Sequence, residues 1–169
     1  ALFRYMADSG LNPVLVNADR GSSWRNIGGG RTAFSLPELA EIAEHNHAIF
    51  KELQKISNID YKTTRYINLA HDEPTFNALD ASRAWSDAYM VDPKNFKKEI
   101  SPYFSTKSKR YLGALITNDC WQATPGKVVD LIRNMGISAG GRIVEDCKVL
   151  EVMKEGSTYS ILALTHDRK

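Results

Sequence analysis

The chain has 169 residues, 43% of them hydrophobic and 25% charged, which is typical of folded domains and excludes disordered or collagen-like chains. Its 22 basic and 20 acidic residues are mixed along the chain and leave a net charge of +2, so we expect no field that attracts nucleic acid or a membrane surface. No apolar run approaches the ~20 residues of a membrane span, and the N-terminus lacks the pattern of a signal peptide, which predicts a soluble protein.

The first two predicted elements are a helix and a buried strand. Residues 1–7 resemble the middle of a helix without an N-cap, and Gly10 is the residue type that ends a helix in a left-handed turn. Residues 13–17 are apolar and β-branched, which favours a strand buried on both faces of a parallel sheet. Because this order makes half of a βαβ unit, we expect a further segment to precede Ala1. Residues 19–32, rich in glycine and small polar residues, predict a loop.

A long helix is predicted next, at about residues 36–56. Ser35 and Glu38 have the spacing of a capping box, Pro37 is tolerated in the first turn, and apolar residues then recur at helical spacing. Residues 61–70 favour a strand.

The middle of the chain continues with a helix and a strand. Asp72 is expected to cap a helix whose buried stripe runs from Phe76 to Tyr89, and the helix should end before Pro93. Residues 111–117 have the composition of a strand.

The last third of the chain returns to an alternation of helix and strand. Thr124 is the expected N-cap of a helix that starts with Pro125 and continues to Ala139. A short strand over residues 142–145 follows, and then two strands, around 149–150 and over 159–164, that turn at Glu155–Gly156. The fold class is therefore α/β at both ends, with an α+β insert between them.

Two stretches resemble the D-amino-acid oxidase family of flavin-dependent oxidoreductases, which includes glycine and sarcosine oxidases. Residues 14–30, VLVNADRGSSWRNIGGG, are similar to the second strand and the following loop of that family. Residues 112–116 and 124–149 are similar to the return of its chain to the flavin domain. The family's GxGxxG turn is absent from this chain, and we expect it upstream of Ala1.

This resemblance implies a fold and a division into segments. A partial Rossmann-like FAD-binding domain would comprise residues 1–58 and 118–169, and part of an inserted α+β substrate domain would comprise residues 59–117. In the family, the second strand ends in an acidic residue that binds the adenosine ribose, and the glycine-containing loop runs beside the flavin.

The resemblance also implies a set of FAD-binding residues: Asn17, Asp19, Ser22, Ser23, Arg25, Asn26, Gly28, Gly29 and Val149. The acidic position falls at Asn17 if no gap is allowed, and Asp19 lies two residues later, so both stay open. Gly28 and Gly29 would let backbone N–H groups approach a pyrophosphate, and Val149 would present its backbone to the adenine.

The function that the resemblance implies is oxidation of the C–N bond of an amino acid or secondary amine, by hydride transfer to FAD. A dehydrogenase of a hydroxy acid or of glycerol phosphate is an alternative, and so is a noncatalytic subunit with the same scaffold. Substrate-binding residues of the family lie largely beyond Lys169, so no catalytic residue is predicted. The expected partner is a small molecule and not a nucleic acid.

The cysteines and histidines do not suggest a metal site. Cys120 and Cys147 have no ligand spacing and are expected to be free thiols in a reducing compartment, which favours a cytoplasmic protein. His45 and His47 are two residues apart on a helix and would point to opposite sides, so both are expected at the solvated surface. His71 and His166 are expected to be structural or exposed.

Two further groups of residues are open to more than one interpretation. The lysine-rich residues 94–110 favour a solvated face over a nucleic-acid patch, because Glu99 interrupts them and the chain is nearly neutral. Trp24, Trp85 and Trp121 are expected to be packing residues, and facing a substrate cavity is the alternative for Trp121.

Overall fold

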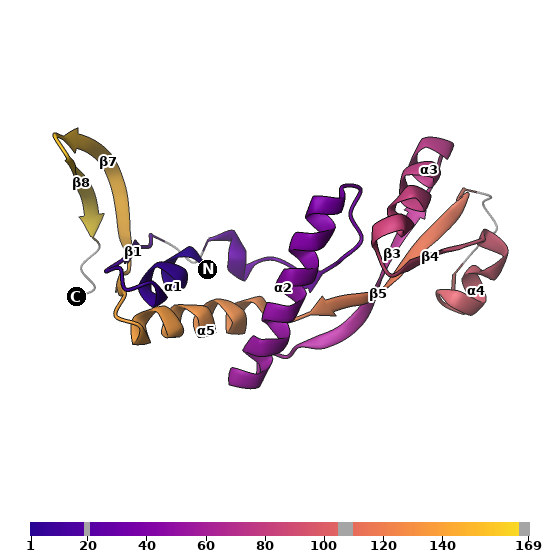
Figure 1. The fold of residues 1–169 in the computed structure, drawn as a ribbon, viewed down its shortest axis with the longest axis horizontal. Coiled ribbons are helices and arrows are strands. Elements are labelled where there is room, and N and C mark those ends of the chain that lie inside the picture. The colour runs from indigo at the N-terminus through magenta and orange to yellow at the C-terminus, as the bar shows by residue number, and fades with distance from the viewer. Residues whose placement is uncertain (19–20, 105–109, 166–169) are drawn as a thin grey trace. The chain divides into compact units, whose positions relative to one another are not determined.

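The computed structural model describes residues 1–18, 21–104 and 110–165, and internal contacts divide the chain into two units (Figure 1). The terminal unit comprises residues 1–27 and 125–169, and the central unit comprises residues 28–124. The predicted boundaries between the FAD-binding and substrate domains, after residues 58 and 117, concern the domains of the whole protein and stay a prediction.

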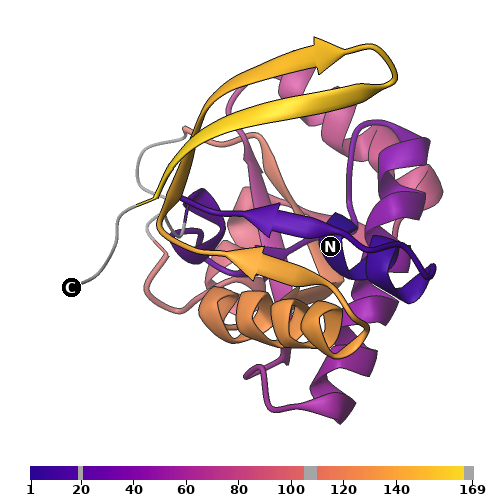
Figure 2. The ribbon, with the colours of Figure 1, turned by 90° about the vertical axis from the view of Figure 1, so that its left-hand side faces the viewer.

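The described residues of the terminal unit form three helical segments and two pairs of strands. They are α1 (Leu2–Asp8), β1 (Val14–Val16), the short turn η1 (Ser22–Trp24), α5 (Pro125–Ser138), β6 (Arg142–Val144), β7 (Cys147–Glu155) and β8 (Thr158–Thr165). β1 and β6 pair in parallel, with Val14 opposite Arg142, and α5 runs beside them (Figure 2). Because β1 and β6 run parallel, the two strands end at the same edge of this small sheet, although they are far apart in sequence.

Helix α1 packs closely on α5 and on the turn after it, because Gly136 in the helix and Gly141 in the turn have no side chain. A Cβ added at Gly136 would lie 2.5 Å from the Phe3 ring, and one at Gly141 would lie 2.6 Å from it. The Phe3 ring therefore fills space that only glycine leaves open.

The strand at β1 is confirmed, but its expected burial on both faces is wrong. Val14 is 45% exposed and Leu15 is 38% exposed. Among the described residues, β1 pairs only with β6, so its other edge and part of its surface have no covering element in this structure.

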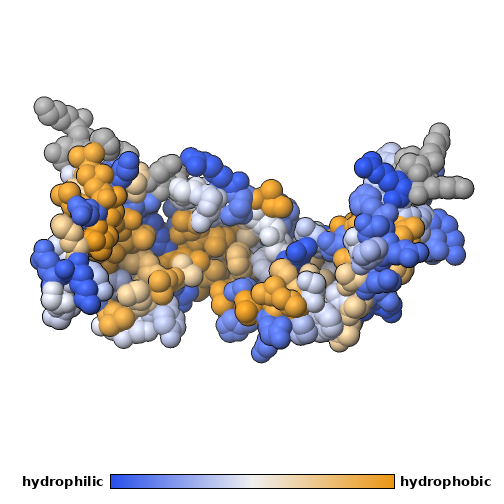
Figure 3. Space-filling view, turned by 90° about the horizontal axis from the view of Figure 1, so that it is seen from above, coloured by the Kyte–Doolittle hydropathy of each residue, from blue (hydrophilic) through white to orange (hydrophobic). Residues whose placement is uncertain are grey.

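The β7–β8 hairpin has the strands and the turn that the sequence predicts. Gly156 turns the chain with φ +63°, a backbone angle that favours glycine. Large apolar side chains remain exposed along both strands, among them Val152, Ile161 and Leu162, and apolar atoms reach the surface over this unit at the left of Figure 3.

The central unit is a twisted antiparallel sheet with helices. Its elements are β2 (Gly29–Gly30), α2 (Pro37–Ile56), β3 (Lys62–Ala70), α3 (Glu73–Ala81), η2 (Ser82–Trp85), β4 (Ala88–Val91), η3 (Pro93–Asn95), α4 (Phe96–Glu99) and β5 (Gly113–Gln122). β5 is the middle strand, with β3 along one side and β4 and β2 in turn along the other. One core lies under β4 and β5, where Val91, Phe96 and Ile116 are buried.

Two local predictions in this unit are wrong. Helix α2 does not use a capping box: Leu36 is the N-cap residue and makes no side-chain cap, because the helix begins directly at Pro37. The helix expected to reach Tyr89 ends at Ala81, since residues 88–91 instead pair with β5 as strand β4. Pairing with a distant segment overrides the helical spacing.

The remaining helix starts follow the sequence more closely. Asp72 caps α3 as predicted and accepts a hydrogen bond from the Thr75 backbone N–H at 2.8 Å. Helix α5 begins at Pro125 as predicted, while the hydroxyl of Thr124, the expected cap, donates to the Asp60 carboxylate at 2.6 Å.

Candidate functional site

A cavity of about 670 Å³ lies in the terminal unit, at the edge where the parallel strands β1 and β6 end. Leu15, Val129 and Ile132 give it apolar walls, and Ser23 and Trp24 of η1 also line it. A crevice beyond the carboxyl ends of parallel strands is where open α/β sheets bind their ligands. The described fold therefore provides a binding site of the kind that the α/β pattern predicts.

Three polar side chains, here called the crevice cluster, meet at this edge: Asn17 after β1, Glu145 after β6 and Arg133 on α5. Asn17 Nδ2 donates to Glu145 Oε2 at 2.9 Å, and the Arg133 guanidinium donates to the other carboxylate oxygen. All three line the cavity. Arg133 and Glu145 are 33% and 40% exposed, so the ion pair is half in contact with solvent.

The main chain around Asn17 fixes the cluster in place. The Asn17 N–H donates to the Val144 carbonyl at 2.9 Å, and the Cys147 N–H donates to the Asn17 carbonyl at 3.0 Å. Between these bonds Asp146 adopts φ +49°, a left-handed conformation that Asp tolerates better than most residues. The chain therefore turns sharply directly after Glu145, beside the cavity.

The structure places the predicted cofactor residues in different parts of the molecule. Asn17 and Ser23 line the cavity, and Ser22 begins η1. Arg25 and Asn26 follow η1, where Asn26 Nδ2 donates to the Ser23 carbonyl at 2.7 Å.

Three of the other predicted residues, Gly28, Gly29 and Val149, do not line this cavity. Gly28 and Gly29 belong to the central unit, and Val149 lies on β7 opposite Ala163, 41% exposed. Asp19 lies outside the described residues. The roles of all of these residues toward FAD stay predictions.

Sequence reasoning did not single out Glu145 or Arg133. The signal for Glu145 was available, because it directly follows a strand that runs parallel to β1 and ends at the same edge. Arg133 carries no such signal: its position depends on which face of α5 turns toward the sheet. The Arg133–Glu145 ion pair can therefore be identified only from the three-dimensional arrangement of α5 and β6.

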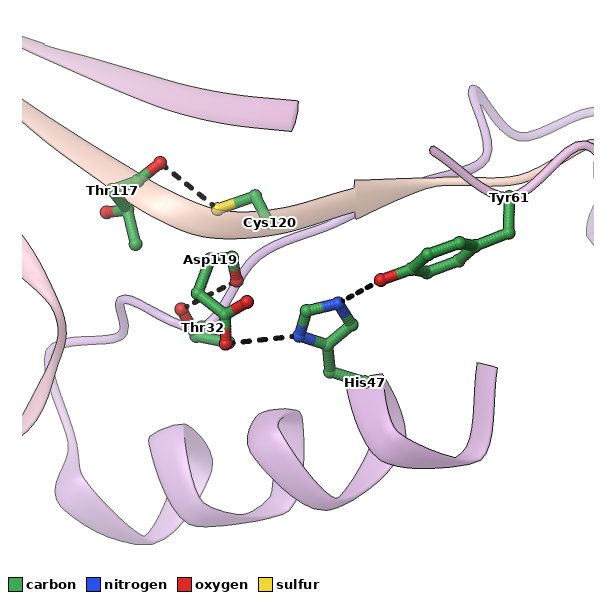
Figure 4. A network of polar contacts seen from close by, with 6 residues as sticks. All are labelled: Thr32, His47, Tyr61, Thr117, Asp119 and Cys120. Carbon is green, nitrogen blue, oxygen red and sulfur yellow. Dashed lines mark hydrogen bonds and ion pairs between the residues drawn. The ribbon is translucent and has the colours of Figure 1, made fainter. Parts of the chain in front are cut away.

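A second polar group, here called the His47 cluster, lies inside the central unit and joins His47, Tyr61 and Asp119 (Figure 4). His47 Nε2 is 2.6 Å from the Tyr61 hydroxyl, and His47 Nδ1 is 3.2 Å from Asp119 Oδ2. With the Nδ1 proton on the ring, the neutral imidazole donates to Asp119 and accepts from Tyr61, so both nitrogens are satisfied.

The expectation that His47 lies at the solvated surface is wrong, since His47 is only 2% exposed. His45 and His71 are exposed, in agreement with the sequence, and His166 lies outside the described residues. The spacing of Ala40, Ala43 and His47 contained the correct signal, because these residues share one face of α2 and all three are buried.

Trp121 connects the His47 cluster to the glycine-containing strand β2. Its ring stacks on His47 at 4.5 Å and an interplanar angle of 7°, and only 5% of the residue is exposed. A Cβ at Gly30 would lie 2.1 Å from Trp121 Cε2. Trp121 is a packing residue as predicted. Its ring leaves no room for a side chain at position 30, which explains the glycine there without any role in ligand binding.

An irregularity in the pairing of β3 with β5 accompanies the cluster. Thr64 is opposite Cys120 and Tyr66 is opposite Thr117, so Arg65 faces two residues of β5, Asn118 and Asp119. Such a bulge changes the direction of a side chain, and here it accompanies the Asp119 contact with His47.

Burial raises the pKa of the neighbouring Cys120 thiol, which favours its neutral form.

In the part of the chain that the structure describes, no three His, Cys, Asp or Glu side chains come together as metal ligands. No helix within residues 1–18, 21–104 and 110–165 combines the length and the apolar character needed to span a membrane. Cys120 and Cys147 are both buried free thiols.

Comparison with known proteins gives a match to one family model. The model described as FAD dependent oxidoreductase matches residues 1–168, nearly the whole chain. No curated protein matches the sequence.

Several solved structures share the fold. L-proline dehydrogenase from P. horikoshii superposes with a TM-score of 0.80 at 16% identity, over 96% of this chain and 45% of that protein. Glycine oxidase from Geobacillus kaustophilus gives a TM-score of 0.75 at 15% identity, over 95% and 47%. L-alpha-glycerophosphate oxidase from Mycoplasma pneumoniae, solved with FAD bound, gives 0.69 at 14% identity, over 98% and 46%. The chain thus spans about half the length of these proteins.

The crevice suits one part of FAD, the adenosine. Its apolar walls, including Leu15 and Ile132, can contact the adenine ring, and the crevice cluster offers a carboxylate, an amide and a guanidinium for hydroxyls and phosphate oxygens. The donor set therefore fits an adenine dinucleotide, with the polar groups gathered at the strand ends.

Proposed function

This chain belongs to the FAD-dependent oxidoreductase family, and on that premise we propose that it oxidises the C–N bond of an amino acid or secondary amine by hydride transfer to FAD. The observation that carries the proposal is the crevice at the ends of β1 and β6, with Asn17 and Glu145 at its edge. The glycine oxidase and proline dehydrogenase folds support the amine substrate class.

The residues of the chain have binding roles in this proposal. Glu145, Asn17 and Ser23 would hold the sugar and phosphate portion of the cofactor through hydrogen bonds, and Leu15 with Ile132 would exclude water from the adenine ring. Bound FAD would accept the hydride from the substrate. In this proposal the described residues supply position and electrostatics for the cofactor.

A second candidate function is oxidation of glycerol phosphate or a hydroxy acid with the same cofactor. The fold of the glycerophosphate oxidase, which covers 98% of this chain, favours it specifically. The two candidates share the FAD-binding part and differ in the group oxidised, a C–N bond or a C–O bond.

Anaerobic reduction of the purified full-length protein tests both candidates. We expect a yellow protein whose flavin absorbance near its visible maximum is bleached by an amino acid or a secondary amine and not by a hydroxy acid or glycerol phosphate. Bleaching by the hydroxy compounds alone would replace the proposal with the second candidate. A full-length protein that contains no flavin and takes up none when FAD is added would contradict both, and would favour a noncatalytic subunit.

A further inference from the structure

Glu145 has acceptor capacity beyond the two hydrogen bonds it makes in the crevice cluster. One carboxylate oxygen accepts from Asn17 and the other from Arg133. A carboxylate offers about four lone-pair positions, so further acceptor positions remain on both oxygens. Because the side chain is 40% exposed and lines the cavity, a ligand in the crevice can reach them.

Asn17 is less suited to accept a hydroxyl proton than Glu145. Its amide nitrogen donates to Glu145 at 2.9 Å, so the side chain orients the carboxylate. A hydrogen bond to an ionised acceptor is roughly twice as strong as a neutral one. Among the described residues at this edge of the sheet, the carboxylate acceptor therefore comes from the end of β6, although Asn17 occupies the corresponding place after β1.

Two features hold Glu145 in place. The Arg133 guanidinium on α5 pairs with its carboxylate, and the chain makes a left-handed turn at Asp146 directly after it. In dinucleotide-binding folds, a carboxylate at the end of a strand accepts hydrogen bonds from ribose hydroxyls. Glu145 has the charge and the strand-end position for this role.

We propose that Glu145, oriented by Asn17 and Arg133, accepts hydrogen bonds from the vicinal ribose hydroxyls of the adenosine in FAD. The ribose is thus held from the end of β6 and not from the end of β1. The inference rests on the proposed function, because it requires an adenine nucleotide in the crevice. It adds a specific residue and a specific ligand group, and it predicts selectivity for ribose over sugars that lack these hydroxyls.

The test uses the flavin-free full-length protein and two nucleotide probes, ADP and its dideoxyribose analogue, which lacks both ribose hydroxyls. Titration calorimetry gives the dissociation constant of each probe. Glu145→Gln should weaken ADP binding about tenfold, the effect of losing a charge-assisted bond, and should weaken binding of the analogue less than about twofold. The wild-type protein should bind ADP more tightly than the analogue.

Two further variants control for structural effects. Glu151→Gln makes the same substitution on the exposed strand β7, outside the cavity, and should leave both dissociation constants unchanged. Glu145→Asp keeps the charge but withdraws it by one methylene, and should weaken ADP binding selectively by an intermediate factor. This variant carries the test if Glu145→Gln fails to fold, as judged by circular dichroism.

The outcomes separate this inference from the proposed function. Equal weakening of ADP and the analogue by the Glu145 variants, or no weakening of either, would overturn the ribose role while flavin bleaching by an amine still stood. A wild-type protein that binds FAD but does not distinguish ADP from the analogue would also overturn it. Failure to bind FAD at all would instead remove the proposed function on which the inference rests.

Discussion

The crevice cluster and the His47 cluster both join a helix to strands through a half-exposed carboxylate, yet the residue on the helix is 2% exposed at His47 and 33% exposed at Arg133. His47 is 2% exposed and both of its ring nitrogens have partners, whereas Glu145 is 40% exposed, beside a cavity. A buried and fully satisfied polar group specifies packing, and unpairing it costs free energy. A half-exposed group with open acceptor positions can bind a ligand. A carboxylate thus supports the packing of a buried histidine in one unit and is available to a ligand in the other.

Of the substitutions that test this comparison, His47→Ala is expected to lower the free energy of unfolding most. The substitution leaves a cavity beneath Trp121 and removes the partners of Tyr61 and Asp119, so the free energy of unfolding should fall by about 3 kcal/mol. Urea denaturation measures it. His45→Ala, on the exposed face of the same helix, is the control and should change the value by less than about 0.5 kcal/mol. Similar losses in both variants would mean that the His47 cluster does not hold the central unit together.

A smaller effect is expected from Gly30→Ala, which tests how the cluster supports β2. The new methyl group would overlap the Trp121 ring, since a Cβ there lies 2.1 Å from Trp121 Cε2. Overpacking of this kind should lower the free energy of unfolding by about 2 kcal/mol.

The control is a double-mutant cycle with Trp121→Leu. Removing the indole should reduce the cost of Gly30→Ala below about 1 kcal/mol, because the two positions then no longer overlap. A cost that stays the same in the Trp121→Leu background would place the origin of the glycine requirement elsewhere than in this contact.

The crevice cluster should contribute little to stability, and Glu145→Gln tests this. The Arg133–Glu145 pair is half-exposed, and such pairs are worth about 0–1 kcal/mol, so thermal or urea unfolding should shift by no more than that, and by less at high salt. The same variant should change ADP binding. A loss above about 2 kcal/mol would show that the cluster is structural and would end the contrast with His47.

Sequence patterns predicted the elements whose signals are local. Gly10, Pro125 and Gly156 mark ends and turns that the structure contains. Residues 88–91 were assigned to a helix because their spacing fits one, and only the distant partner β5 makes them a strand. Local spacing cannot contain that information.

The residues of the candidate site also fall into those that local sequence signals predict and those that depend on tertiary packing. Asn17 and Ser23 could be predicted to lie at a strand end and in the loop after it, and both line the cavity. Arg133 could not, because its role depends on the packing of α5 against strands distant in sequence. The burial of His47 could have been predicted from its helical spacing with Ala40 and Ala43, but its spacing from His45 was interpreted as placing both histidines at the surface.

The smallest expected effect concerns Asp72, an exposed carboxylate that belongs to neither cluster and so measures what a single solvated cap contributes. Hydrogen bonds from the Thr75 hydroxyl and backbone N–H hold the pKa of Asp72 below its ordinary value of 3.8. A carboxylate with a lowered folded pKa stabilises the fold above its unfolded pKa, and this contribution is lost as the pH falls through the folded value. Asp72→Asn should therefore flatten the acid limb of the stability profile, measured as the urea midpoint at neutral pH and below pH 3.8. Glu73→Gln, in the first turn of the same helix, removes a charge without removing the cap and should leave this limb in place. If both variants flatten it equally, the effect comes from net charge near the helix N-terminus and not from the Thr75 hydrogen bonds.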